Sequence, residues 1–230
     1  MSWVQSKLTR RIGAAILLAL VASPAAANSL VVRATGAAAT QYRPGTSLPD
    51  NAQIRLGPND SIVLLTSRGT RTFRGPGNFR PTQAGVALAG STGARIGAVR
   101  TAGIDPNSPQ PSIWQIDVSS SGTVCLTSAS GVTLWRPDPS STARLSIRGP
   151  GGNTQVSWPA GQSTLAWPSG VPIANNGDYQ LTQPNSPVPT SVRVRLIGQV
   201  STDFQAIAAT LISNGCQQQL DLLVDSLPGL

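Results

Sequence analysis

Residues 54–65 read IRLGPNDSIVLL, two short apolar segments on either side of the turn sequence Gly57-Pro58-Asn59-Asp60. Glycine, proline, asparagine and aspartate favour turns, whereas aliphatic and β-branched residues favour strands. The same alternation of short apolar segments and turn residues recurs at 30–33, 70–73, 123–126, 144–147 and 192–197. The sequence therefore predicts a mainly β protein.

Charge divides the chain into two unlike parts. Residues 28–100 contain nine Arg and two Asp, whereas residues 101–230 contain five Arg and seven Asp. The change coincides with a proline-rich segment at 101–112, which can hold neither a helix nor a central strand. We therefore expect a small basic β domain over 28–100 and a linker over 101–112.

The part that follows the linker also has the pattern of a β protein. Residues 113–198 contain about eight short segments of strand type, spaced as in an Ig-like sandwich. The first of them, Ile113 to Val118, alternates apolar and polar residues. The sequence predicts an Ig-like β-sandwich over 113–198.

The spacing of apolar residues becomes helical after residue 199. Phe204, Ile207 and Leu211 form one stripe, Asn214-Gly215 is a stop signal, and a second stripe follows from residue 216 to residue 227. We expect a hairpin of two short helices over 199–230. Helices this short have to bury their stripes, either inside the protein or against a partner.

The first 27 residues have the features of a secretory signal peptide. Lys7, Arg10 and Arg11 precede an apolar run from Ile12 to Val21, and Ala25-Ala26-Ala27 provides a cleavage site after residue 27. The run is about half the roughly 20 residues that span a bilayer, so a retained anchor is the weaker alternative. We expect a periplasmic or secreted protein without a transmembrane segment after cleavage.

Removal of this segment lowers the formal net charge. It carries three of the seventeen basic residues, so fourteen Arg and nine Asp remain and the charge falls from +8 to +5. Outside the cytoplasm, the two cysteines, Cys125 and Cys216, are expected to form a disulfide that clamps the hairpin onto the sandwich. Two buried free thiols are the alternative.

A series of glycines and apolar residues extends through the first domain. It consists of Gly36, Pro44-Gly45, Leu48, Ile54, Asp60-Ser61-Ile62, Leu64-Leu65, Gly69-Thr70 and Gly75. In this order the residues from about 30 to 79 resemble the FecR-like domain, a β-rich periplasmic module. Regulatory members of that family have a cytoplasmic anti-sigma segment and a membrane helix before the module, where this chain has the expected signal peptide. The resemblance implies a secreted module that contacts other envelope proteins or ligands, without a direct anti-sigma role.

The residue inventory excludes most catalytic sites. The chain has no His and no Glu, and its only lysine is Lys7. These absences rule out Ser-His-Asp and Cys-His relays, imidazole metal sites, and lysine chemistry beyond residue 7. A pair of Asp residues from distant loops is the remaining route to a hydrolase. We expect no enzymatic activity, no catalytic residues, no metal site and no cofactor.

Two groups of residues are candidates for binding. Arg68, Arg71, Arg74 and Arg80 would bind an acidic face of an envelope protein or an anionic envelope polymer, and an exported protein is not expected to bind nucleic acid. Alternatively, these arginines keep an edge strand solvated. Trp135, Trp158 and Trp167 would form a glycan platform if they are exposed, and would fill the sandwich core if they are buried.

The resemblance, together with these patterns, implies a FecR-like binding or sensing accessory that contacts another envelope protein. A glycan-binding or structural protein of the cell envelope, acting through the sandwich tryptophans, is the alternative.

Overall fold

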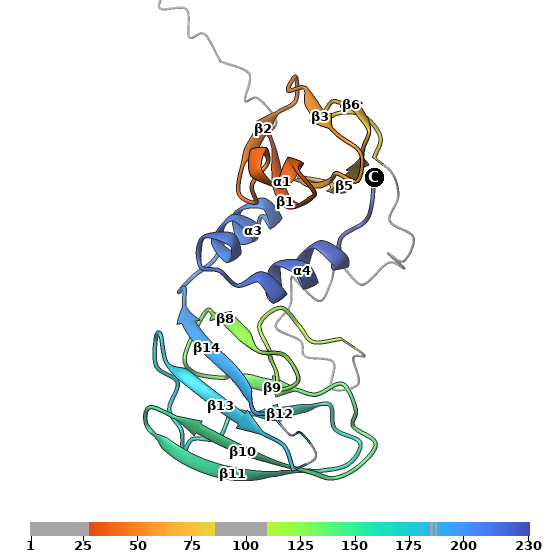
Figure 1. Cartoon of the computed structure of the whole chain (residues 1–230). Coiled ribbons are helices and arrows are strands. Elements are labelled where there is room, and N and C mark those ends of the chain that lie inside the picture. Colours follow the sequence, from red (N-terminus) through yellow and green to blue (C-terminus); the bar gives the residue numbers. More distant parts are fainter. Residues whose placement is uncertain (1–27, 86–109, 185, 187) are drawn as a thin grey trace, which may run out of the picture.

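The computed structural model describes residues 28–85, 110–184, 186 and 188–230. The expected signal peptide over 1–27 and most of the expected linker over 101–112 lie outside the described residues. The described chain is mainly β with two helices near its C-terminal end, which confirms the predicted fold class. Two β units lie at opposite ends of the molecule, and the two helices lie between them (Figure 1).

The first β unit contains a four-stranded antiparallel sheet in the order β2-β1-β4-β5 and a separate ribbon of β3 and β6. The stretch 54–65 forms β3, a turn and most of β4, as predicted. No local sequence pattern predicted β2, β6 or α1, each of which has only three or four residues. The elements are β1 (Asn28–Thr35), α1 (Ala38–Gln41), β2 (Ser47–Pro49), β3 (Ile54–Leu56), β4 (Ser61–Thr66), β5 (Gly69–Arg74) and β6 (Gly77–Phe79).

Strand β4 is buried on both faces. Its side chains alternate, so Ile62 and Leu64 face one side of the sheet while Val63 and Leu65 face the other. Ile62 and Leu64 pack with Phe73 in a core on the side of the β3–β6 ribbon. Val63 and Leu65 pack against the C-terminal helices. This two-sided burial explains why β4 is a continuous apolar run rather than an alternating one.

Asp60 organises the turn before β4. Its side chain is buried, and its two carboxylate oxygens accept hydrogen bonds from the Gly57 amide at 2.8 Å and from the Ala38 amide at 3.2 Å. Gly36, with φ 75°, approaches this carboxylate so closely that a Cβ atom there would collide with it. The hydrogen bonds from Gly57 and then from Ala38 lower the pKa of Asp60.

We expect Asp60→Asn to make stability less dependent on pH in the acidic range. Because the folded-state pKa of Asp60 is lowered, its carboxylate stabilises the fold above the unfolded-state pKa of about 4. This contribution disappears as the pH falls through the lower folded-state pKa. Urea unfolding at about pH 6 and about pH 3 measures the effect. Asp50→Asn removes a carboxylate without these hydrogen bonds and is the control; equal pH dependence of wild type and Asp60→Asn would contradict the prediction.

The second β unit is a sandwich of two sheets. A five-stranded sheet in the order β11-β10-β13-β14-β8 shares a core with a three-stranded sheet in the order β12-β9-β7. Ile116, Leu134, Ile147 and Val194 are among the core residues, and each comes from a different strand. The strands are β7 (Ile116–Asp117), β8 (Gly122–Leu126), β9 (Thr133–Trp135), β10 (Ala143–Gly149), β11 (Gly152–Trp158), β12 (Thr164–Ala166), β13 (Asp178–Thr182) and β14 (Thr190–Leu196).

The expected strand from Ile113 to Val118 is mostly wrong, because only Ile116–Asp117 is a strand. A turn closes before it, where the Gln115 amide donates to the Ser112 carbonyl and the Gln115 side-chain oxygen accepts from the Ser112 amide. The turn sends Ile113 into the core beneath the helices and Ile116 into the sandwich core.

The helical hairpin is present as predicted, with α3 (Phe204–Ser213) and α4 (Gln217–Ser226). Asp203 caps α3 by accepting a hydrogen bond from the Ala206 amide at 2.9 Å. Gly215, with φ 71°, provides the left-handed residue between the helices. Among the described residues, no helix has the length and apolar character that crossing a membrane requires.

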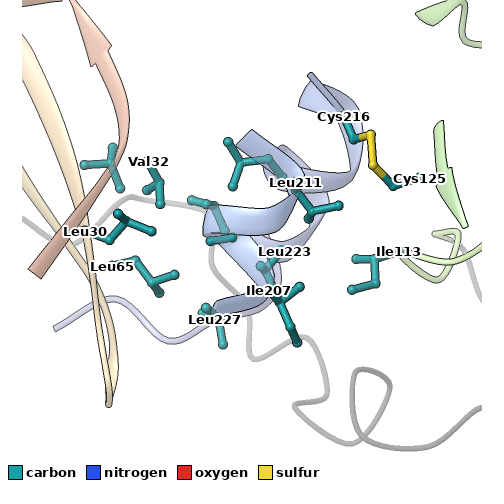
Figure 2. Close-up of a cluster of buried hydrophobic side chains, with 14 residues drawn as sticks. Leu30, Val32, Leu65, Ile113, Cys125, Ile207, Leu211, Cys216, Leu223 and Leu227 are labelled. Atoms are coloured by element: carbon teal, nitrogen blue, oxygen red, sulfur yellow. A yellow bond between two sulfur atoms is a disulfide. The ribbon is translucent and has the colours of Figure 1, made fainter. Parts of the chain in front are cut away.

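The predicted disulfide between Cys125 and Cys216 is confirmed, and it joins the hairpin to β8. The hairpin also contacts the first β unit, which the sequence analysis did not predict: α3 lies against β1 and β4, while α4 lies against β8. Figure 2 shows one apolar cluster that extends from Leu30 and Leu65 through the helices to Ile113 and the disulfide. The two β units therefore share a core through the hairpin.

An ion-pair cluster joins β1 to α4. Arg33 of β1 bonds to Asp221, with Nε 3.2 Å from Oδ1, and its Nη2 lies 3.6 Å from Asp225. Burial opposes the charge of Arg33, but hydrogen bonding and attraction from Asp221 and Asp225 outweigh it and raise its pKa. The cluster is partly exposed to solvent, where ion pairs contribute little to the free energy of unfolding. Its main effect is to orient α4 against β1.

The C-terminal segment covers one open sheet edge in each β unit. The buried side chain of Gln219 bonds to both backbone groups of Cys125 at the edge of β8. At the edge of β5, the Thr70 amide donates to the Pro228 carbonyl at 2.9 Å, and the Leu230 amide donates to the Thr70 carbonyl at 2.8 Å. Open edges can pair with other chains, so this covering disfavours edge-to-edge association.

Candidate anion-binding site

The first β unit carries a surface hollow of about 290 Å³ on the β3–β6 ribbon. Five of its lining side chains are exposed, and Phe79 is half-buried. Two guanidinium groups and three carboxamides face this space without a carboxylate in the lining, an arrangement that favours an anion. The lining residues are Gln53, Arg55, Asn78, Phe79, Arg80 and Gln83.

Backbone pairing sets the floor of this hollow. Arg55 of β3 lies directly opposite Asn78 of β6, so the two side chains leave the same face of the ribbon. The Arg55 amide donates to the hydroxyl of buried Tyr42 at 3.0 Å, which ties β3 to the core. The ring of Phe79 packs 5.2 Å from the ring of Phe73, measured between centroids. The floor therefore rests on a packed layer.

The turn after β6 supplies the other side of the hollow. The Arg80 amide donates to Gln83 Oε1 at 2.8 Å, and the Gln83 amide donates to the Arg80 carbonyl at 3.0 Å. Half-buried Arg71 of β5 donates from Nη1 to the carbonyl of buried Pro81 within this turn. Arg71 is therefore a positioning residue for Arg80 and Gln83.

The structure does not gather the four predicted arginines into one patch. Arg68 lies in the two-residue turn between β4 and β5, and Arg74 lies at the far end of β5. Arg71 and Arg74 are three positions apart on one strand, so their side chains leave opposite faces. Of the four, only Arg80 lines the hollow, where it is accompanied by Arg55.

Two of the three tryptophans that were predicted for a glycan platform are buried. Trp135 and Trp158 are 5% and 1% exposed, and the Arg136 guanidinium lies 5.1 Å from the centre of the Trp158 ring. Half-buried Trp167 donates its indole N–H to the Val171 carbonyl. Trp158 belongs to the sandwich core, whereas Trp135 is buried outside that core, next to the core residue Leu134 on β9. Neither ring face is available to a sugar.

Four residues of the hollow were not predicted from the sequence: Gln53, Arg55, Asn78 and Gln83. One signal was present, because Arg55 stands between Ile54 and Leu56, and two buried neighbours in a strand require the residue between them to face outwards. No local pattern indicated that β3 pairs with β6, or that the turn at Arg80 folds beside them.

A scan of protein-family models, a search of curated proteins and a search of solved structures each found no match to this chain. Within the described part of the chain, no three His, Cys, Asp or Glu side chains lie close enough together to hold a metal ion. What the protein binds has to be inferred from its own residues.

Proposed function

We propose that the chain is a non-enzymatic accessory protein of the bacterial cell envelope, FecR-like over about residues 30–79, that acts in the periplasm or after secretion. It binds or senses another envelope protein through its basic first β unit. The observation that carries this proposal is uncompensated charge: residues 28–85 contain seven Arg and two Asp, and within the described chain only Arg33 of these arginines forms an ion pair.

The positive charge implies an acidic partner. Arg43, Arg55, Arg68, Arg74 and Arg80 are all exposed. Exposed guanidinium groups without an ion-pair partner attract acidic surfaces, speed up the encounter and reject basic partners. We therefore infer that the partner presents an acidic face to these arginines.

The remaining chemistry supports the same proposal. A disulfide such as Cys125–Cys216 persists in oxidising compartments, which supports a location outside the cytoplasm. The sequence contains no His and no Glu, the most common general acids and bases, which supports binding rather than catalysis.

Site-specific photo-crosslinking in cells tests the proposed contact. A photoreactive residue is placed at Ser67, which is exposed beside Arg68, and in a separate strain at Gln180, which is exposed on β13. We expect the probe at position 67 to capture a defined protein partner and the probe at position 180 to capture none. Combining the probe at 67 with Arg68→Gln and Arg74→Gln is expected to reduce capture roughly fivefold, because this protein loses two charges that attract the acidic partner.

The matched control is Arg148→Gln with Arg195→Gln, which removes the same charge from exposed positions of the sandwich. Capture at position 67 should be unchanged in this variant. Identical adducts from both probes, no protein adduct at position 67, or equal losses in the two charge variants would contradict the proposal.

A further inference from the structure

The hollow on the β3–β6 ribbon has three features that together define a ligand class. The first is its charge. Arg55 and Arg80 come from different elements, and within the described chain neither guanidinium has an ion-pair or hydrogen-bond partner. Guanidinium groups form paired hydrogen bonds with carboxylates and phosphates. The charge alone therefore indicates an oxyanion.

The second feature is the set of carboxamides. A carboxamide donates and accepts hydrogen bonds, so it matches neighbouring hydroxyl groups, which also do both. Gln53 and Asn78 form no side-chain hydrogen bond with the described residues, while Gln83 uses its oxygen on the Arg80 amide and keeps its NH₂ group as a donor. The hollow can therefore bind several hydroxyl groups beside the anion.

The third feature is the lack of an apolar pocket in this lining. Phe79 is its one apolar residue, and the ring of Phe79 packs against Phe73. An extended peptide bound at a strand edge gains its specificity from pockets for alternate side chains, which this lining does not provide. A phosphate ion can accept from the carboxamide NH₂ groups, but it offers few hydroxyl donors to the side-chain oxygens of Gln53 and Asn78. A sugar ring that carries a carboxylate uses both kinds of group.

We propose that this hollow binds a hexuronic acid unit of an acidic polysaccharide. Arg55 and Arg80 hold the carboxylate, and Gln53, Asn78 and Gln83 hold the ring hydroxyls. Its volume of about 290 Å³ is close to the lower end of the range for ligand pockets, roughly 300–1,000 Å³, which suits one ring-sized group of a polymer. The contacts made by Tyr42 and Arg71 order the walls in advance and reduce the entropic cost of binding.

Isothermal titration calorimetry on the purified, oxidised protein tests this proposal. The probes are oligogalacturonate, oligomannuronate and a hyaluronan oligosaccharide, compared with neutral malto-oligosaccharide and inorganic phosphate. We expect at least one acidic oligosaccharide to bind at least about tenfold more tightly than both comparison ligands. Arg55→Gln with Arg80→Gln should weaken this binding by about tenfold or more, since it removes two charge-assisted contacts.

Two further variants sharpen the result. Arg148→Gln with Arg195→Gln removes equal charge elsewhere and should leave the affinity within about twofold. Asn78→Ala should weaken uronate binding more than phosphate binding, because only the sugar hydroxyls use the carboxamide both as donor and as acceptor. Failure of all three acidic probes, equally tight phosphate binding, or equal losses in both arginine pairs would overturn the proposal. Because Ser67 lies outside the hollow, protein capture there should survive Arg55→Gln with Arg80→Gln, so the two proposals fail separately.

Discussion

Replacing Cys125 and Cys216 together by alanine is expected to lower the free energy of unfolding by about 4 to 5 kcal/mol. The disulfide joins residues separated by 91 positions, and the entropy that a crosslink removes from the unfolded chain grows with the logarithm of loop length. Alanine adds no polar group to the shared core, where both cysteines are fully buried. Urea unfolding of the variant and the oxidised wild type measures the difference.

Reduction of the wild type provides the matching comparison, because the chain then keeps both sulfur atoms. Since the sulfurs are buried, a thiol reductant should act slowly on the native protein and quickly once urea opens the hairpin. Reduced wild type should then unfold at nearly the same urea concentration as the alanine variant. Equal midpoints for oxidised and reduced protein would show that the disulfide does not hold the hairpin in place.

Gln219→Leu is expected to cost about 2 to 6 kcal/mol, although leucine is similar in size and more apolar. The Gln219 side chain accepts from the Cys125 amide at 2.6 Å, donates to the Cys125 carbonyl at 2.7 Å, and donates to the Ile113 carbonyl. Leucine would leave the two Cys125 groups buried without partners, at about 1 to 3 kcal/mol for each, and would also remove the donor to the Ile113 carbonyl. Urea unfolding measures the total cost, and hydrogen exchange of the Cys125 amide locates it.

The neighbouring residue Gln218 is the control. It is half-buried and donates one hydrogen bond to the Ser121 carbonyl at 2.7 Å. Because that carbonyl lies where water can replace the lost donor, Gln218→Leu should cost no more than about 1 kcal/mol. Equal losses for the two variants would mean that covering the β8 edge does not depend on Gln219.

Local patterns predicted most of the secondary structure. The expected strands at Ser61–Leu65 and Arg144–Ile147 lie within β4 and β10, and the helical stripe from Phe204 lies within α3. These elements have either alternation or helical spacing over enough residues to be recognised. Short β2 and β6 have neither, and the turn at Gln115 depends on a side-chain hydrogen bond that no periodicity reveals.

The candidate site was predictable only in part. Arg80 was selected from the sequence because it stands in a basic run, but that run is spread over a turn, two faces of β5 and a second turn. Proximity in sequence is a poor guide within strands, because successive side chains point to opposite faces. The partner of Arg80 in the hollow, Arg55, lies on a strand that pairs with β6 across the unit.

The sequence by itself determined the β class and the helical hairpin, because the spacing of apolar residues and the helix stop signal are local properties of the chain. It also determined the cysteine pair, because the chain has only two cysteines. The tertiary structure decided where the apolar stripes of the hairpin go, and it directs them to both β units rather than to the sandwich alone. It also placed Trp158 in a core and Arg55 beside Arg80. Such placements depend on which surfaces meet. The free energy of burying apolar area comes from contacts between elements that are far apart in sequence, so no local pattern specifies them.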